Sequence, residues 1–329
     1  MNEEFEGIKT IQIHAQTRYP IVSAYEFEFL KSETEIQRLL KPCTIYFIIQ
    51  RPLLYFSNVR SGSGALTFDI KDGTDKPPLK CEFVPSMNGF CKEDEELEIQ
   101  FEFYKKVPDA APPFDDVAVF KLRDVAGKYL GWFSPNLILY RFFEGTLDVD
   151  VKGPIPAYLD YDVHYIGKAF SQDIWKRLTG HEKMQSILTR EDALNSKNLR
   201  APFEIALLML DIDGFDEANV YPQFDFVLED GADPIVYRFT FEENDPRFEE
   251  YNAPKLGPRA LELTNEVEAM LVNTFRPKYN EILFENYPNI SSGTRSAGYT
   301  QSTLFIEKMP VILRTASHTQ GIVLPNRIT

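Results

Sequence analysis

Short apolar and aromatic runs fill the first 150 residues, and clusters of glycine, proline, asparagine and aspartate separate them. Runs of this length are typical of strands, and the separating residues suit the backbone angles of turns. The run at 96–104, ELEIQFEFY, alternates polar and apolar positions, so one face should be buried and the other wet. The pattern predicts a β-rich N-terminal domain. The expected strands are 10–16, 24–30, 44–50, 53–59, 65–70, 79–84, 96–104, 117–122 and 139–145.

The character of the chain changes after VKGPIPAY at 151–158, where two prolines cannot continue a strand ladder. We therefore expect a β-rich domain over 1–150 and a second domain over 151–329. Strand and helix patterns are mixed in the second half, which predicts an α+β fold overall. The expected elements are strands at 159–167 and 203–212, a helix at 171–188, a hairpin of 221–228 with 234–243, a helix at 258–275 stopped by Pro277, and a strand within 303–313.

Length and composition agree with two folded domains. A chain of 329 residues exceeds the roughly 100 to 200 residues of one domain. Hydrophobic residues make up 43% and charged residues 26%, as in an ordinary globular protein. The acidic N-terminus does not resemble a signal peptide, and no apolar run is long enough to cross a membrane. Three scattered cysteines form no disulfide framework, so we expect a cytoplasmic protein without membrane contact.

The net charge of −15 bears on the partner. Such a charge repels polyanions on average and argues against a protein that coats nucleic acid by bulk attraction. Basic residues concentrated at one site, or a basic partner protein, would offset this repulsion.

One group of candidate functional residues lies at a predicted turn from strand to helix. Arg177 and His181 stand four residues apart, so both project from one face of the helix, near Tyr165 and Lys168. These residue types could hold a phosphate and move a proton. The alternative is a solvated helix face beside a core tyrosine.

A second group lies on the predicted helix at 259–275. Glu268 lies along the apolar side of this helix, whereas Glu262 faces polar positions. A carboxylate on an apolar side must be paired or bind a cation, because isolated burial of its charge is unfavourable. Asn280 follows Pro277 and could turn back toward Glu268. The neighbours of Glu268 at helical spacing are Leu261, Thr264, Leu271 and Phe275.

Together these segments resemble the GIY-YIG nuclease family, and especially the amino-terminal incision domain of the bacterial excision-repair nuclease. The resemblance is carried by YIGKA at 165–169, by Arg177 and His181 after it, and by AMLVNTFRPKYN at 269–280. The interval from Glu268 to Asn280 also agrees with the family. The resemblance covers about a third of the chain, and the first 150 residues resemble no family that we recognise.

The resemblance implies a small mixed sheet flanked by helices and hydrolysis of a phosphodiester with one divalent ion. Glu268 would bind Mg²⁺ or Mn²⁺, and Tyr165 would activate or orient the attacking water. Arg177 would clamp the phosphate, with Lys168 as a further positive charge. His181 would transfer a proton or contact the phosphate, and Asn280 would orient groups around the metal.

The sequence departs from the family in two places. No GIY triplet precedes YIG at the usual distance, so Tyr158 or Tyr161 is the candidate substrate-binding residue in its place. The interval between Tyr165 and Glu268 is long, which implies an insertion at about 190–255.

Two further patterns resemble metal sites. DIDGFDE at 211–217 lacks the later ligands of a calcium loop, so we expect a turn after a strand. Asp160, Asp162 and His164 alternate on one strand, and we interpret them as the polar face of a half-buried strand rather than as metal ligands.

The sequence thus predicts a metal-dependent endonuclease, acting on DNA rather than RNA, with restriction or anti-phage defence as compatible roles. The N-terminal domain would recognise a partner protein or the substrate. One alternative is a catalytically degenerate GIY-YIG-like binding or scaffold protein that works with a partner. Another is an enzyme that acts on something other than nucleic acid.

Overall fold

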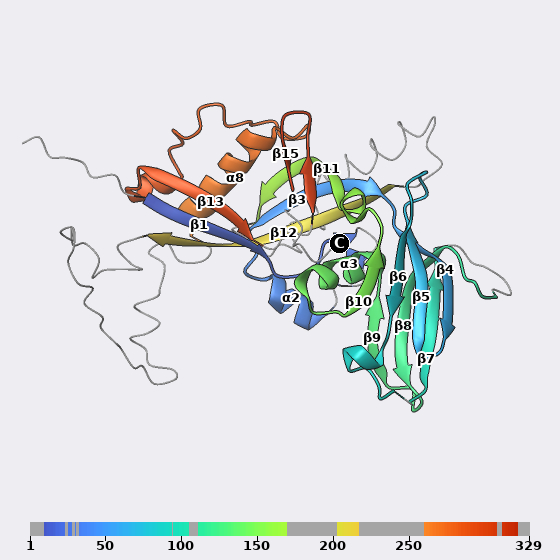
Figure 1. Cartoon of the computed structure of the whole chain (residues 1–329). Helices are drawn as coiled ribbons and strands as arrows, with labels where there is room; N and C mark the ends of the chain where they lie inside the picture. The colour runs from blue at the N-terminus through green and yellow to red at the C-terminus, as the bar shows by residue number, and fades with distance from the viewer. Residues whose placement is uncertain are drawn as a thin grey trace, which may run out of the picture.

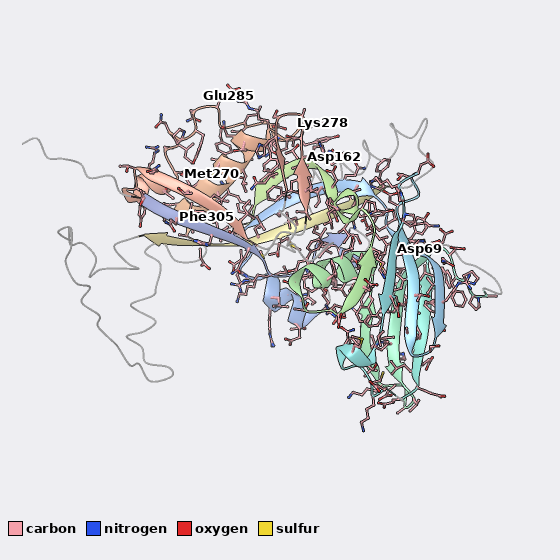
Figure 2. All side chains as sticks on the ribbon, viewed as in Figure 1. Asp69, Asp162, Met270, Lys278, Glu285 and Phe305 are labelled. Atoms are coloured by element: carbon pink, nitrogen blue, oxygen red, sulfur yellow. The ribbon has the colours of Figure 1, made fainter. Side chains whose placement is uncertain are left out.

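The computed structural model describes residues 10–23, 26–27, 30, 33–93, 95–104, 111–169, 203–216, 260–307 and 311–321. These residues form two sheets with helices against them, which confirms a mixed fold rich in strands. Figure 2 shows the side chains of both regions, with Met270 in the first and Asp69 in the second. We call them sheet A and sheet B.

Sheet A has eight strands, and its central strand β3 (Ile45–Pro52) lies between β11 (Asp160–Lys168) and β12 (Phe203–Asp216). Both pairings are antiparallel, whereas β1 pairs with β13 and β11 pairs with β14 in parallel. The remaining strands are β1 (Thr10–Thr17), β2 (Val22–Ser23), β13 (Gln301–Glu307), β14 (Ile312–Arg314) and β15 (Thr319–Gln320).

The two faces of sheet A have different covers (Figure 1). Helix α8 (Leu261–Phe275) places Leu263, Val267 and Leu271 at intervals of four residues, so they form one buried stripe against the sheet. Short helix α2 (Thr34–Leu40) belongs to the opposite face, where Leu40 packs with alternate residues of β3 and β12. We call these the α8 face and the α2 face.

Sheet B contains the strands between β3 and β11 in the sequence. Its core is a cluster of phenylalanine rings, in which Phe120 lies 5.0 to 6.0 Å from four others. Helix α3 (Pro135–Glu144) adds Ile138 and Leu139 to this core. The strands are β4 (Tyr55–Gly62), β5 (Ala65–Lys71), β6 (Leu79–Phe83), β7 (Leu97–Phe103), β8 (Val117–Asp124), β9 (Tyr129–Phe133) and β10 (Val149–Lys152). Short 3-10 helices among the described residues are Ser86–Asn88, Ile155–Tyr158 and, beside α8, Thr294–Ala297.

Two predicted strands are helical instead. Residues 139–144 of one predicted strand belong to α3, where Ser134 Oγ accepts a hydrogen bond from Leu137 N and Gly145, with φ 67°, follows the last helical residue. Within 24–30, the described residues Glu26, Phe27 and Leu30 are helical. A short apolar run of this kind fits a strand or a buried helix equally well, and tertiary packing selects the helix in both segments.

The predicted boundary at residue 150 does not divide the sheets. Strands β1 and β3 hydrogen-bond with β11, β12 and β13, so sheet A combines residues from both predicted domains, while sheet B comes from the chain between them. The predicted insertion at 190–255 also needs correction, because its residues 203–216 form β12 at the centre of sheet A. A strand continuing to Asp216 likewise replaces the expected turn at 211–217.

Other predicted elements agree with the structure or lie outside it. The helix at 258–275 is confirmed as α8, and 303–313 contains two strands, β13 and β14, instead of one. The predicted helix at 171–188 and the hairpin at 221–228 and 234–243 lie outside the described residues. Among the described helices, none has the length and apolar character required to cross a membrane.

Candidate functional site

Lys168 and Glu268, from the two motifs of the resemblance, meet on the α8 face. Nζ of Lys168 lies 2.7 Å from Oε2 of Glu268 and donates a hydrogen bond of 2.7 Å to Oδ1 of Asn265. The Glu268 side chain is 13% exposed and that of Lys168 is 36% exposed. The carboxylate on the apolar side of the helix is therefore neutralised by a lysine of β11, which removes the need for another cation.

Tyr165 lies on the other face of the sheet. Opposite residues in an antiparallel pair share a face, and Tyr165 is opposite Ile48 whereas Lys168 is opposite Ile45. Ile48 belongs to the α2 face and Ile45 to the α8 face. The Tyr165 ring lies 6.0 Å from that of Tyr46, which also belongs to the α2 face.

A β-bulge at His164 places Tyr165 on the α2 face and Lys168 on the α8 face. The register of β11 against β3 shifts between Val163 and Tyr165, so residues after the bulge change face. Val163 packs on the α8 face, and simple alternation would have placed Tyr165 there too. Gly167 fits the same arrangement, because a Cβ at this position would come within 2.6 Å of Tyr165 Cε1. The prediction that Tyr165 and Glu268 meet at one site is therefore wrong.

Asn280 is near β11, and its side chain forms hydrogen bonds with the backbone of that strand. Its Oδ1 accepts from Ile166 N at 3.0 Å, and its Nδ2 donates to Ile166 O at 2.7 Å. The amide of Tyr279 also donates to His164 O at 3.1 Å. Asn280 and Tyr279 therefore pair with the edge of β11 as a neighbouring strand would, and the Asn280 amide is not turned toward Glu268.

The two tyrosines proposed to replace the missing first motif are core residues. Tyr158 is 2% exposed in the core of sheet B, and its hydroxyl donates to Pro77 O at 3.0 Å. Tyr161 is 2% exposed, and the Cζ atom of Arg51 lies 4.5 Å from its ring centroid. Their assignment as substrate-binding residues is corrected, because buried rings cannot contact a polyanion in solvent.

Arg177 and His181 lie outside the described residues. In the polar trio on β11, Asp160 pairs with Arg314 at 2.8 Å, and His164 Nε2 lies 2.8 Å from Oε1 of Gln50, the residue opposite Asp162.

These residues do not fit a Mg²⁺ or Mn²⁺ centre. Hard divalent ions prefer several oxygen ligands, whereas Glu268 is the one predicted ligand and Lys168 already lies against it. Within the described ranges, no group of three His, Cys, Asp or Glu side chains is arranged to hold a metal ion.

Several buried charged residues were not predicted from the sequence. Glu266 of α8 is 1% exposed, and Tyr287 Oη and Thr294 N donate to its two oxygens at 3.0 and 3.1 Å. Arg51 and Glu204 form an ion pair of 2.8 Å between side chains that are 2% and 7% exposed. Glu204 stands in the apolar run of β12, and Arg51 lies near the end of β3. A charged residue within or beside an apolar run is the signal in the sequence that could have revealed this buried pair.

Glu26 is another buried carboxylate. It accepts hydrogen bonds from Ser23 N at 2.9 Å and from Ser23 Oγ at 3.0 Å. Burial raises its pKa, and the charge of Glu204 acts in the same direction. Because the folded state holds the proton more tightly than the unfolded chain, this group lowers stability as pH rises from its ordinary pKa through the raised value.

Replacing Glu26 with glutamine should remove this loss of stability at higher pH. Glutamine keeps an acceptor for Ser23 without a charge, so we expect the variant to gain stability relative to the natural chain as pH increases from 4.5 toward neutrality. Urea unfolding at several pH values measures the difference. A difference that stays constant with pH would contradict the prediction, and Glu82→Gln, an exposed position on β6, is the control.

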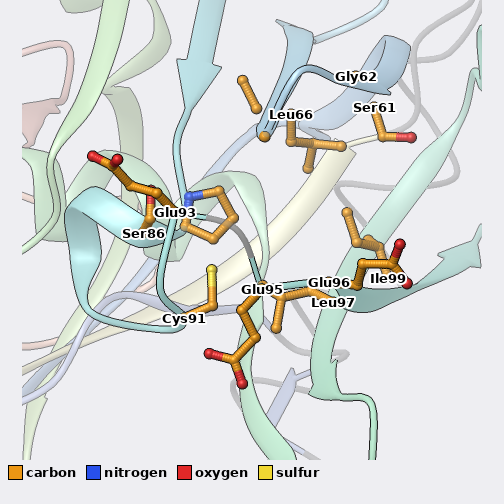
Figure 3. A pocket seen from close by; sticks show the side chains of 13 residues that line it. Ser61, Gly62, Leu66, Ser86, Cys91, Glu93, Glu95, Glu96, Leu97 and Ile99 are labelled. Carbon is orange, nitrogen blue, oxygen red and sulfur yellow. The ribbon is translucent and has the colours of Figure 1, made fainter.

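Two cavities lie away from Lys168 and Glu268. One of about 400 Å³ at the end of sheet B is lined by Cys91, Glu93, Glu95 and Glu96, among others. Figure 3 shows the Glu93 and Glu95 carboxylates pointing apart, so they do not form a common ligand site. The other, of about 530 Å³, lies between the α2 side of sheet A and the strands β7, β8 and β9.

Comparisons with models of known families, with curated proteins and with solved structures found no match for this chain. Inference about function therefore rests on the geometry of the described residues.

Proposed function

We propose that this chain is a binding or scaffold protein that works with a protein partner. The supporting observation is the separation of Tyr165 from Glu268 by sheet A. Phosphodiester hydrolysis requires the group that orients water and the group that holds the metal to meet around one phosphate. Side chains on opposite faces of a packed sheet cannot do this without repacking both cores.

The polar groups of the two motifs also have structural roles. Lys168 joins β11 to α8 through Glu268 and Asn265, and Asn280 covers the edge of β11. A segment that keeps the sequence of a nuclease motif while its side chains hold the fold together is what a degenerate domain would retain.

The charge of the chain favours a basic partner over nucleic acid. At a net charge of −15 the average field attracts cationic proteins and repels polyanions. A cationic partner would also gain from steering at low ionic strength.

A plasmid-cleavage assay tests this proposal against the nuclease. Supercoiled DNA is incubated with the natural chain, with Glu268→Ala and with the matched α8 variant Glu262→Ala, in Mg²⁺, in Mn²⁺ and in chelator. We expect the same uncut plasmid in all reactions, beside a known nuclease that cuts.

Cleavage that needs the metal and disappears only in Glu268→Ala would overturn the binding proposal. It would instead support the predicted endonuclease, with its suggested role in restriction or defence.

A further inference from the structure

The larger cavity is a cleft between two parts of the molecule. One wall comes from the segment that follows β1, with Leu30 and with Ile36 of α2, and the other comes from the outer side of sheet B, with Val119 of β8 and Trp132 of β9. A volume of about 530 Å³ is within the range of ligand sites. It has room for more than one side chain.

Aromatic rings and carboxylates line this cleft together. The rings are those of Tyr19, Tyr129 and Trp132, and the carboxylates are those of Glu26, Glu33 and Glu102. Faces of aromatic rings attract cations, and a nearby carboxylate strengthens the attraction.

The positive side chains in and beside the cleft contact other groups of the protein. Lys121 forms an ion pair with Glu102 across β7 and β8. Arg123 Nη1 donates to Gly127 O at 3.0 Å, and its Cζ lies 6.0 Å from the Tyr129 ring centroid. Arg141 of α3 lies close enough to act on Tyr19 and Tyr129, but it packs 5.9 Å from the Phe133 ring centroid. Neither Glu26 nor Glu33 forms an ion pair with these positive groups, and the charged side chains that line the cleft are three carboxylates and two positive groups.

Glu26 is the deepest of these groups, at 8% exposed, and it accepts hydrogen bonds from Ser23 N and Ser23 Oγ. Burial, followed by the charge of Glu26, raises the pKa of Tyr19 to about 12, while the charge of Arg141 acts in the opposite direction. An incoming cation would relieve the unfavourable burial of the Glu26 carboxylate.

We propose that this cleft binds a basic polypeptide segment, with a lysine or arginine side chain inserted between Trp132 and Tyr19 toward Glu26 and Glu33. The methylene stem of such a side chain would pack on Leu30, Ile36 and Val119, while its charged end meets the rings and the carboxylates. The net charge of −15 supplies the long-range complementarity. This inference rests on the proposed binding function and gives the chemistry of the partner.

The test is fluorescence anisotropy with a labelled peptide of alternating lysine and glycine. A second peptide carries norleucine in place of each lysine, which keeps the stem and removes the charge. We expect the natural chain to bind the lysine peptide and not the norleucine peptide. Tetramethylammonium chloride, compared with sodium chloride at equal ionic strength, shows whether the ammonium group alone competes.

Three variants locate the binding. Glu26→Gln and Glu33→Gln each remove one negative charge from the cleft, and Glu82→Gln removes the same charge from the exposed face of β6. We expect about tenfold weaker binding for each cleft variant and less than about a twofold change for Glu82→Gln. Glu33 is exposed, so its variant should fold even if the buried change at Glu26 disturbs the helix.

The outcomes separate this inference from the proposed function. Equal weakening by all three variants would mean attraction by net charge alone and would overturn the cleft as the site. Absence of binding by the natural chain would overturn the basic ligand. In either case the plasmid assay decides independently whether the chain is a nuclease.

Discussion

Replacing Arg51 with alanine is expected to lower the free energy of unfolding by about 3–5 kcal/mol. The guanidinium is 2% exposed, donates from Nε to Glu204 at 2.8 Å and from Nη1 to Tyr158 O at 2.5 Å, and lies over the Tyr161 ring. Its removal leaves the carboxylate of Glu204 buried without a cation, and that uncompensated charge is the main source of the loss.

Urea unfolding of purified variants measures this effect, and the control is another arginine. Arg38 pairs with Glu35 at 2.9 Å on the surface, where the side chains are 72% and 79% exposed, so Arg38→Ala should change stability by less than about 0.5 kcal/mol. A combined Arg51→Met and Glu204→Leu variant should recover most of the loss, because it removes both charges. An Arg51→Ala effect no larger than that of Arg38→Ala would contradict the burial of this pair.

Asn280→Ala is expected to lower the free energy of unfolding by about 2–3 kcal/mol, from the loss of partners for both the N–H and the C=O of Ile166. The amide of Ile166 should also exchange with solvent faster, since Asn280 covers this edge of β11. Denaturant unfolding and amide hydrogen exchange measure the two effects.

The matched control is Asn286→Ala, because Asn286 is exposed and donates to Asn289 O within a surface turn. We expect a change within about 0.5 kcal/mol there. A catalytic role of Asn280 makes the opposite prediction, namely unchanged stability together with loss of metal-dependent cleavage, so the same variant distinguishes the two roles.

The sequence located several elements of the site correctly. The apolar spacing of α8, its end before Pro277 and a strand at 159–167 all follow local patterns, and the structure confirms them, with β11 continuing to Lys168. The carboxylate of Glu268 was expected to need a partner, and Lys168 is that partner. Local periodicity suffices for such predictions, because each depends on residues close together in the chain.

Tertiary structure decided which residues face each other. Alternation along β11 would place Tyr165 with Val163 on the α8 face, but one extra residue at His164 turns it to the α2 face. The bulge exists in the pairing with β3, a strand more than a hundred residues earlier, so no local pattern contains it.

The division of the strands between two sheets also depended on pairing between segments that are distant in the sequence. Strand character could be recognised in 203–212 from its apolar run, but its place between β1 and β3 could not. The cleft beside Trp132 and Glu26 likewise joins two segments that are distant in sequence. By itself the sequence determined many of the strands, the main helix and the need for a charge partner at Glu268, because these follow from local spacing. Only the tertiary structure decided the faces, sheets and cleft, because strand pairing between distant segments sets them.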